Sequence, residues 1–463
     1  MTWKSAVVGA AALSLLMEAG ALRAQTSRAS QTASPPQEIT LPQAVEVALK
    51  NNPTLQAADS YAEAVRHAVA EAKSGYYPRL DFSEGFVRSN NPVFVFGSLL
   101  TQRQFTAQDF ALGSLNRPGF LNNFQSTVTV DQTLFDAGRT RRAMVSAGLG
   151  KEIACEDQRL ARMQVIAAVV RAYADAALSR EQLNAAVQAM RSAEADLQQA
   201  ENVRAAGLST DADVLSIRVH LAAVREQQIR RAADLEVAQA ALNDALGQPL
   251  DAAYSLTTPL APAPLPDLPL AAYEESALGA RPEARQARLA SGAAANQAAD
   301  ARSSLLPEVV LHGAVEADRR DFYAKGGANW LVSAGLRWNL FNGLGDKARI
   351  AEAQSLVARS HAQQQSADSA IRLEVRRAYA AYRAAAQRIE VARAAMAEAG
   401  ESLRITQNRY HTGMNTVTDL LRTESAVLDA RTRYLEAVHD QRVAAAMLEL
   451  AAGKLSEDSE VLN

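Results

Sequence analysis

The side chains of this chain that could do chemistry are few, and they are not arranged for catalysis. The six histidines show no spacing that would hold a metal ion, no segment reads H-E-x-x-H, and no glycine-rich segment would cradle a phosphate. The only cysteine, Cys155, lies in a helical pattern and is expected to be a small apolar filler. We therefore expect no enzymatic activity, no metal and no cofactor, so any energy for the function must come from a partner.

Two carboxylates occupy equivalent positions in the two halves of the chain. Asp213 and Asp419 are 206 residues apart, and each follows a glycine and a threonine that predict the start of a helix. A carboxylate in the first turn of a helix is stabilised by the helix dipole, so a purely structural role is one interpretation of both. Arg422 follows Asp419 by three residues, a spacing at which the two side chains can pair for about 0.2–0.5 kcal/mol.

The offset of 206 residues extends over most of the chain. Leu134 matches Leu340, and the segment 171–174 matches 377–380, with no gap over more than a hundred positions. Upstream of these segments the offset is 229, which places 23 extra residues in the first copy before Leu134. An internal duplication of this kind determines the architecture, because each copy must fold as the same unit.

Each copy has two stretches in which apolar and polar residues alternate, the pattern of a strand with one apolar face. In the last stretch, Trp330, Val332, Leu336 and Trp338 fall on one face. We expect strands at about 79–88, 124–135, 308–316 and 330–341.

Long segments without proline follow these strands and predict helices. We expect long helices at 138–205 and 346–411, each about 100 Å long at 1.5 Å per residue, and shorter helices at 211–246 and 416–452. The heptad spacing of Leu421, Leu428 and Leu435 predicts coiled-coil packing. The expected fold class is mainly α with membrane β, built from a duplicated unit of a strand pair and a long coiled-coil helical hairpin.

The remaining segments differ in composition. In residues 1–24, Lys4 precedes an apolar run of about twelve residues, which predicts a secretory signal peptide. No cysteine follows it that could carry a lipid, so no lipid is expected at an N-terminal Cys. The first repeat is expected at 38–250, a Pro-rich linker strap at 251–269, the second repeat at 270–453 and a C-terminal tail at 454–463.

Trp330 and Trp338 share the apolar face of the last expected strand. Eight residues at about 3.4 Å each span roughly 27 Å, close to the ~25 Å apolar band of outer-membrane strands, which has aromatic residues at both interfaces. The alternative is an amphipathic strand that covers a soluble core. Because a signal peptide accompanies the strands, we favour contact with outer-membrane lipid and name Trp330 and Trp338 as membrane-interface aromatics.

Four strands are too few to close a membrane barrel, since barrels begin near eight strands. An open sheet in lipid would leave backbone N–H and C=O groups unpaired at several kcal/mol each. A chain that spans a membrane with these strands must therefore oligomerise, and three copies would supply twelve strands.

At this point the chain resembles the TolC-like outer-membrane efflux family over essentially its whole mature length. The segments that carry the resemblance, in order, are Leu41-Pro42-Gln43-Ala44-Val45, Leu134-Phe135-Asp136-Ala137-Gly138-Arg139, Gly207-Leu208-Ser209, Leu340-Phe341-Asn342-Gly343 and Tyr410-His411-Thr412-Gly413. The resemblance implies a homotrimer with a 12-stranded β-barrel continuous with a periplasmic α-barrel. It also implies docking on a periplasmic adaptor protein and an inner-membrane efflux transporter, so that small molecules leave through the outer membrane.

The resemblance places a periplasmic gate at the tips of the helical hairpins. The matching positions are Asp213, Tyr410, Asn415, Asp419 and Arg422. The best-known members have an arginine at the position of Asn415 and an aspartate at that of Arg422. Since a charge-assisted hydrogen bond is about twice as strong as a neutral one, we expect a gate that opens more easily and is less cation-selective.

The two hairpin turns resemble the segments that the family presents to its adaptor. The adaptor-docking residues implied are Gly207, Leu208, Ser209, Gly413 and Met414. An ordinary glycine C-cap with its hydrophobic contact is the alternative interpretation of both turns.

The composition limits the functions that remain. The net charge of −3 and the lack of a basic cluster argue against nucleic-acid binding. A type I protein-secretion exit channel is an alternative to small-molecule efflux, and a secreted coiled-coil structural protein without a pore is an alternative of another class. The long first loop, 89–123, is expected at the extracellular mouth.

Overall fold

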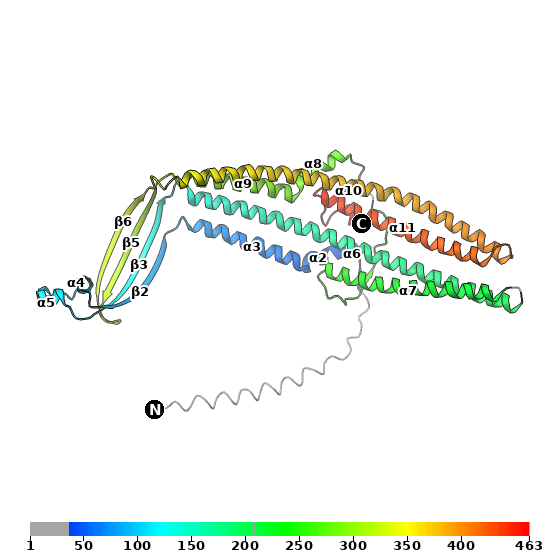
Figure 1. Ribbon diagram of the computed structural model, residues 1–463, viewed down its shortest axis with the longest axis horizontal. Helices are drawn as coiled ribbons and strands as arrows, with labels where there is room; N and C mark the ends of the chain where they lie inside the picture. The colour runs from blue at the N-terminus through cyan, green and yellow to red at the C-terminus, as the bar shows by residue number, and fades with distance from the viewer. Residues whose placement is uncertain (1–36, 208, 264, 463) are drawn as a thin grey trace, which may run out of the picture.

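The computed structural model describes residues 37–207, 209–263 and 265–462. The expected signal peptide at 1–24 and the docking residue Leu208 lie outside the described residues. The molecule is elongated, with a β-sheet at one end and two long helical hairpins that run side by side to the other end (Figure 1). In the described part of the chain, no helix combines the length and apolar character needed to cross a bilayer.

The first copy contains the two halves of a broken helix, two strands and one long hairpin. In chain order its elements are β1 (Gln37–Ile39), α2 (Leu41–Asn51), α3 (Pro53–Ser74), β2 (Arg79–Ser89), β3 (Leu121–Phe135), α6 (Arg139–Ala205) and α7 (Asp211–Ala245). The extra residues of this copy lie between β2 and β3 and fold into α4 (Pro92–Thr101), η1 (Ala107–Phe110) and α5 (Leu112–Asn116).

The linker carries β4 (Tyr254–Leu256), and the second copy then repeats the order of the first. Its elements are α8 (Leu270–Ala280), α9 (Pro282–Ser303), β5 (Glu308–Arg319), β6 (Gly327–Arg337), α10 (Gly345–His411) and α11 (Val417–Ala451), and η2 (Glu460–Leu462) follows in the C-terminal tail. The long helices α6 and α10 both have 67 residues, and α7 and α11 both have 35.

The sheet has the strand order β2-β3-β5-β6, and adjacent strands in it are antiparallel. The register places Phe82, Val128, Val315 and Trp330 directly opposite one another in one row across the four strands. Residues in such a row point to the same face of the sheet. This row is therefore apolar from edge to edge, although a sheet of this kind normally covers a core with its apolar residues.

One strand differs from its expected bounds. The alternation of apolar residues predicted a strand at 330–341, whereas β6 runs from Gly327 to Arg337. Trp338 lies beyond the end of β6, where its indole Nε1–H donates to the backbone oxygen of Leu305 at 3.0 Å. The ladder ends there because β5, the partner of β6, begins only at Glu308, which is opposite Arg337.

The four long helices form two antiparallel hairpins, α6–α7 and α10–α11, with α11 packed against α6. Helix α3 lies along α6, and α9 lies between α6 and α10, so the half of the helical part nearer the sheet is also four helices wide. The largest apolar cluster lies near the middle of the molecule, where α6 meets α2, the linker and the C-terminal residues. Its most buried members include Leu41, Ile166, Val169, Val170, Leu246 and Leu462.

A pair of equivalent joints lies beside this cluster. Gly247 follows α7 with a φ of +68°, and a Cβ atom there would lie 2.6 Å from the backbone oxygen of Asn51, at the break between α2 and α3. Gly453 follows α11 with a φ of +73°, and a Cβ there would lie 2.9 Å from the backbone nitrogen of Arg281, at the break between α8 and α9. The duplication is thus visible as two copies of one close backbone contact.

Candidate functional site

The turns of the two hairpins lie together at the end of the molecule that is farthest from the sheet (Figure 1). Gly207 and Gly413 stand there with φ values of +78° and +74°, a conformation that glycine adopts without the steric cost of a side chain. In the second turn, the N–H of Gly413 donates to Tyr410 O and the N–H of Met414 to Arg409 O, which completes a Schellman motif. A Cβ atom at either glycine would have no neighbour within 4 Å, so both turns are open to close approach.

Asp213 is held by the residues that begin α7. Its Oδ2 accepts hydrogen bonds from the hydroxyl of Thr210 at 2.8 Å and from the hydroxyl of Ser209 at 3.1 Å. The N–H of Asp213 donates in return to the Thr210 hydroxyl, which completes a capping box. The hydrogen bonds from Thr210 lower the pKa of Asp213 against the opposing effect of burial.

The second turn repeats this arrangement with Asp419 at the start of α11. The hydroxyl of Thr416 donates to Asp419 Oδ2 at 2.8 Å, and Asp419 N–H donates to the same hydroxyl at 3.2 Å. Arg422 places Nη2 3.7 Å from Asp419 Oδ1 and remains largely exposed. Hydrogen bonds from Thr416 lower the pKa of Asp419, and the positive charge of Arg422 adds to the effect.

Tyr410 joins the second hairpin to the first. It packs against a small buried cluster that comes from both hairpins: Ala200, Val214, Ile217 and Val417. Burial raises the pKa of Tyr410, and the carboxylates of Asp213 and Asp196 add to the rise. Asn415 is half-buried in the turn before Thr416.

The structure also brings together three residues that the sequence analysis did not name. Glu424 on α11 lies between Asp196 on α6 and His220 on α7, with Glu424 Oε2 3.4 Å from His220 Nε2. The only sequence signal is one of spacing. Ala193 and Ala200 are buried and seven residues apart, the spacing of a packed helix face. Asp196 lies between them, so a charged residue falls on the packed face of α6.

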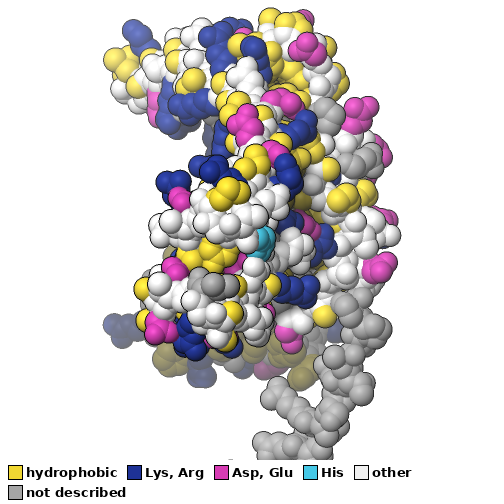
Figure 2. Space-filling model, turned by 90° about the vertical axis from the view of Figure 1, so that its right-hand side faces the viewer, with side chains coloured by type: hydrophobic (Ala, Val, Ile, Leu, Met, Phe, Trp, Pro, Cys, Tyr) yellow, Lys and Arg dark blue, Asp and Glu magenta, His cyan; other side chains and the backbone are white. Residues whose placement is uncertain are grey.

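The surface of this end carries charges of both signs. In Figure 2, which faces the hairpin turns, the side chains of Lys and Arg are interspersed with those of Asp and Glu. Met414 is one of the large apolar side chains exposed here, at 63% of its surface. The exposed end therefore offers an apolar side chain and the two open glycine turns within a mixed-charge surface.

At the opposite end, the apolar row of the sheet faces outward without cover. Trp330 is 79% exposed, and Phe82 and Val315 in the same row are more than half exposed. The other face carries polar side chains, among them Asp131 and His312, whose Oδ1 and Nδ1 atoms lie 2.7 Å apart.

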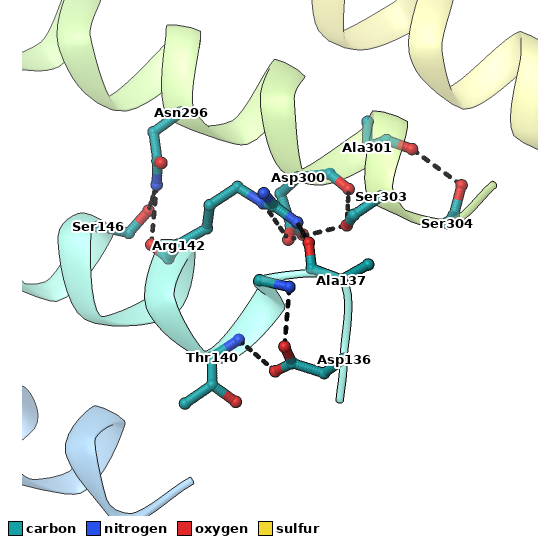
Figure 3. A network of polar contacts seen from close by, with 11 residues as sticks. Asp136, Ala137, Thr140, Arg142, Ser146, Asn296, Asp300, Ala301, Ser303 and Ser304 are labelled. Carbon is teal, nitrogen blue, oxygen red and sulfur yellow. Dashed lines mark hydrogen bonds and ion pairs between the residues drawn. The ribbon is translucent and has the colours of Figure 1, made fainter. Parts of the chain in front are cut away.

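A polar network connects the sheet to the helices (Figure 3). Asp136, directly after β3, accepts from the backbone N–H groups of Gly138 at 2.8 Å and Thr140 at 2.6 Å and so caps α6. Arg142 donates from Nε to Asp300 Oδ1 on α9 at 3.2 Å, and Asn296 of α9 donates to Arg142 O at 2.8 Å. These contacts fix α6 relative to the end of β3 and to α9.

Comparison with known proteins places these features in a family. The pattern of the family described as "Outer membrane efflux protein" matches residues 44–248 and 274–454, which are the two copies. Protein CyaE of Bordetella pertussis is 29% identical over 426 residues, which cover 91% of this chain and 85% of that protein. The alkaline protease secretion protein AprF of Pseudomonas aeruginosa is 26% identical over 421 residues, covering 89% and 84%.

The fold has counterparts among solved structures. The outer membrane protein VceC of Vibrio cholerae superposes with a TM-score of 0.74 at 20% identity, over 89% of this chain and 96% of that chain. The predicted resemblance to TolC-like proteins is thereby confirmed, and so is the mainly helical fold with a sheet.

Proposed function

The chain belongs to the outer membrane efflux protein family, and from this premise we propose that three copies form an exit duct through the outer membrane. The duct is passive, and it passes small molecules that an inner-membrane efflux transporter delivers through a periplasmic adaptor protein. Two solved structures of similar fold are described as outer-membrane channels, which supports a chain that supplies a path rather than a reaction.

The observation that carries the proposal is the sheet with two open edges and an exposed apolar row on one face. Among the residues that the structure describes, strands β2 and β6 each have a partner on one side only. In lipid, the unpaired N–H and C=O groups of such edges cost several kcal/mol each, so the β6 edge of one copy pairs with the β2 edge of the next. Three copies then close a barrel of twelve strands, the apolar row with Trp330 faces lipid, and the polar face with His312 lines a water-filled path.

The helical hairpins continue this path into the periplasm. Helices of 67 residues extend about 100 Å from the sheet at 1.5 Å per residue. In the trimer they form the wall of an α-barrel below the membrane. Trp330 and Trp338 anchor the barrel at the membrane interfaces, without a lipid at an N-terminal cysteine.

The hairpin turns form the periplasmic gate of the duct. Tyr410 holds the two hairpins of one copy together through the apolar cluster that contains Val214 and Ile217, and Asn415 takes the place of a charged link to Asp213. Each copy contributes Asp419 and Arg422, whose charges are close enough to offset one another. We expect weak ion selectivity, and a strong cation preference in planar bilayers that Asp419→Ala abolishes would contradict this gate.

The open turns are the docking surface for the adaptor. The glycines at 207 and 413 leave room for a partner helix, and the sequence assigns Leu208, Ser209 and Met414 to the same docking surface. Met414→Asp should weaken capture of the adaptor without a change in the melting temperature, because Met414 is exposed. The exposed Val391, in the middle of α10, provides a matched control as Val391→Asp.

A second candidate is protein secretion, because one of the relatives is named for the secretion of alkaline protease. The sheet and hairpins serve either cargo. Cross-linking in the native cell, followed by identification of the bound inner-membrane transporter, separates the two: a drug or solvent pump supports efflux, and an ATP-driven protein exporter supports secretion.

The channel itself is tested by fractionation and conductance. We expect heat-modifiable trimers in the outer-membrane fraction and steady single-channel currents in planar bilayers. A mature chain recovered as a soluble monomer without detergent would refute the duct and would favour a secreted coiled-coil structural protein.

A further inference from the structure

Polar side chains cross the contact between the two hairpins, where α6 packs against α11. We call this contact the inter-hairpin seam. His439 Nε2 lies 2.7 Å from Asp175 Oδ1, and further toward the turns Arg431 donates to Gln188. Nearest the turns, Asp196 on α6 faces Glu424 on α11. The seam thus depends on polar contacts that a change in protonation can alter.

The Asp196–Glu424 pair is the one contact of this seam that two unprotonated side chains cannot make. A hydrogen bond between the two carboxyl groups acts on the pKa of both, and the Glu424 side chain is only 9% exposed. Asp196 Oδ2 and Glu424 Oε1 are buried and have no hydrogen-bond donor. A carboxylate only accepts hydrogen bonds, whereas a protonated carboxyl also donates one. A single retained proton therefore bridges the pair, and its loss leaves two negative charges face to face.

We propose that Asp196 and Glu424 form a proton-dependent latch that fastens α6 to α11 and is released when the shared proton dissociates. The contact itself does not depend on the proposed function. Its consequence, the opening of the duct, rests on that function. Asp196 lies eleven residues before Gly207, or about 16 Å from the turn at 1.5 Å per residue. Release at this point frees the segments that carry the gate residues.

The electrostatics of the pair agree with its geometry. Burial raises the pKa of Asp196 to about 7, and the neighbouring Glu424 adds to the rise. Burial opposes ionisation of Glu424 as well, but hydrogen bonds with His220 and Asp196 outweigh it and lower the pKa of Glu424. The shared proton accordingly belongs to Asp196, and Glu424 carries the negative charge.

The sign of the pH effect follows from this assignment. In the packed seam Asp196 retains a proton. After separation Asp196 has its ordinary pKa of 3.8 and releases that proton. The contribution of the latch is complete below that value, declines as the pH rises toward about 7, and is lost above it. His220 on α7 faces Glu424 and helps to lower its pKa, while Tyr410 on α10 has a raised pKa and stays neutral.

A cavity beside the pair provides room for water after release. Its volume is about 380 Å³, and His220, Val224, Leu428 and Glu424 are among the residues that line it. Two carboxylates that repel each other can be hydrated from this side without displacing the apolar cluster of Val214 and Ile217 nearer the turns.

The latch is tested by measuring the separation of the hairpins directly. Nitroxide labels at Leu215→Cys on α7 and Ile405→Cys on α10, both exposed sites, report it by electron paramagnetic resonance in a Cys155→Ser background. We expect the distance to lengthen between pH 5.5 and about 7 and to change no further up to pH 8.5, because the contribution of the latch is exhausted above the Asp196 pKa of about 7. Asp196→Asn should keep the short distance at every pH, because its amide still donates to Glu424 and does not titrate.

Controls separate the latch from other titrating groups. Asp429→Asn removes an exposed carboxylate from the same helix and should retain the wild-type pH profile. If Asp196→Asn does not fold, Glu424→Gln replaces it with the same expectation. A wild-type distance that is unchanged across this pH range overturns the latch. So does a pH response that survives in Asp196→Asn, in particular one that disappears in His439→Gln.

Conductance distinguishes failure of the latch from failure of the duct. A pH-dependent distance without current at any pH would refute the duct and leave the latch in place. Currents accompanied by a constant distance would refute the latch alone.

Discussion

Gly247→Ala and Gly413→Ala place the same methyl group on the same left-handed backbone in different surroundings. Alanine in this conformation costs about 1–2 kcal/mol relative to glycine. At Gly413, where a Cβ has no neighbour within 4 Å, this is the whole expected loss. At Gly247 the Cβ would lie 2.6 Å from Asn51 O and 2.9 Å from Asn52 Cα, both backbone atoms that must shift.

The two costs at Gly247 add. Forcing an extra methyl group into a packed site costs about 1–3 kcal/mol, so Gly247→Ala should lose about 2–5 kcal/mol in total. Gly453→Ala is an internal replicate, since its Cβ would lie 2.9 Å from the backbone nitrogen of Arg281. We expect Gly247→Ala and Gly453→Ala to resemble each other and to exceed Gly413→Ala.

Hydrogen exchange in detergent-solubilised protein measures these losses locally. A loss of at least 2 kcal/mol corresponds to exchange that is about 30-fold faster or more, at tenfold per 1.4 kcal/mol. Gly247→Ala should show this in the peptide covering 48–56, while Gly413→Ala leaves that peptide unchanged. The reasoning fails if both variants lower the melting temperature equally, or if exchange at 48–56 is unaffected by Gly247→Ala.

Three further predictions concern single side chains. Thr210→Ala should cost about 0.5–2 kcal/mol by removing the cap of α7, seen in the denaturant midpoint. In the wild type the cap should weaken as the pH falls below 3.8, since the pKa of Asp213 is lowered and the folded state binds fewer protons. Trp330→Ala should reduce flotation with lipid vesicles, and Asn329→Ala, on the other face, should not. Burial lowers the pKa of His439, but hydrogen bonds and charges from Asp175 and Asp440 outweigh it and raise the pKa above 6.5. The contribution of protonated His439 to stability is complete below pH 6.5 and is lost as the pH rises through the folded pKa. His439→Gln should therefore flatten part of the decline in melting temperature between pH 6.5 and 8.5.

Much of the architecture was accessible from patterns that repeat along the chain. The alternation around Val332 predicted a strand, and the glycines at 207 and 413 predicted the ends of long helices, because both signals are local and strong. The offset of 206 residues then tied the halves together. The end of β6 at Arg337 was not accessible, because it depends on where its partner strand begins rather than on the residues of β6.

The proton-sharing pair could not have been derived in the same way. Asp196 and Glu424 are 228 residues apart, and their contact depends on the rotation of α6 against α11. Heptad spacing shows that each residue lies on the face of its helix that packs against a neighbouring helix. It does not show which helix face lies opposite. The parallel pairing of β1 with β4 was missed for a similar reason, since strands of three residues carry no periodic signal.

The equal lengths of corresponding helices have a consequence for how such a chain can change in evolution. One residue inserted into α6 alone would advance everything beyond it by about 1.5 Å and rotate it by about 100°. The turn at Gly207 would then no longer be level with the turn at Gly413, and the heptad stripes would fall out of phase. Insertions and deletions in the helices must therefore occur in both copies together or not at all. The segment between β2 and β3 that holds α4 and α5 has no such counterpart, so length variation among relatives should accumulate in that segment while the long helices keep their length.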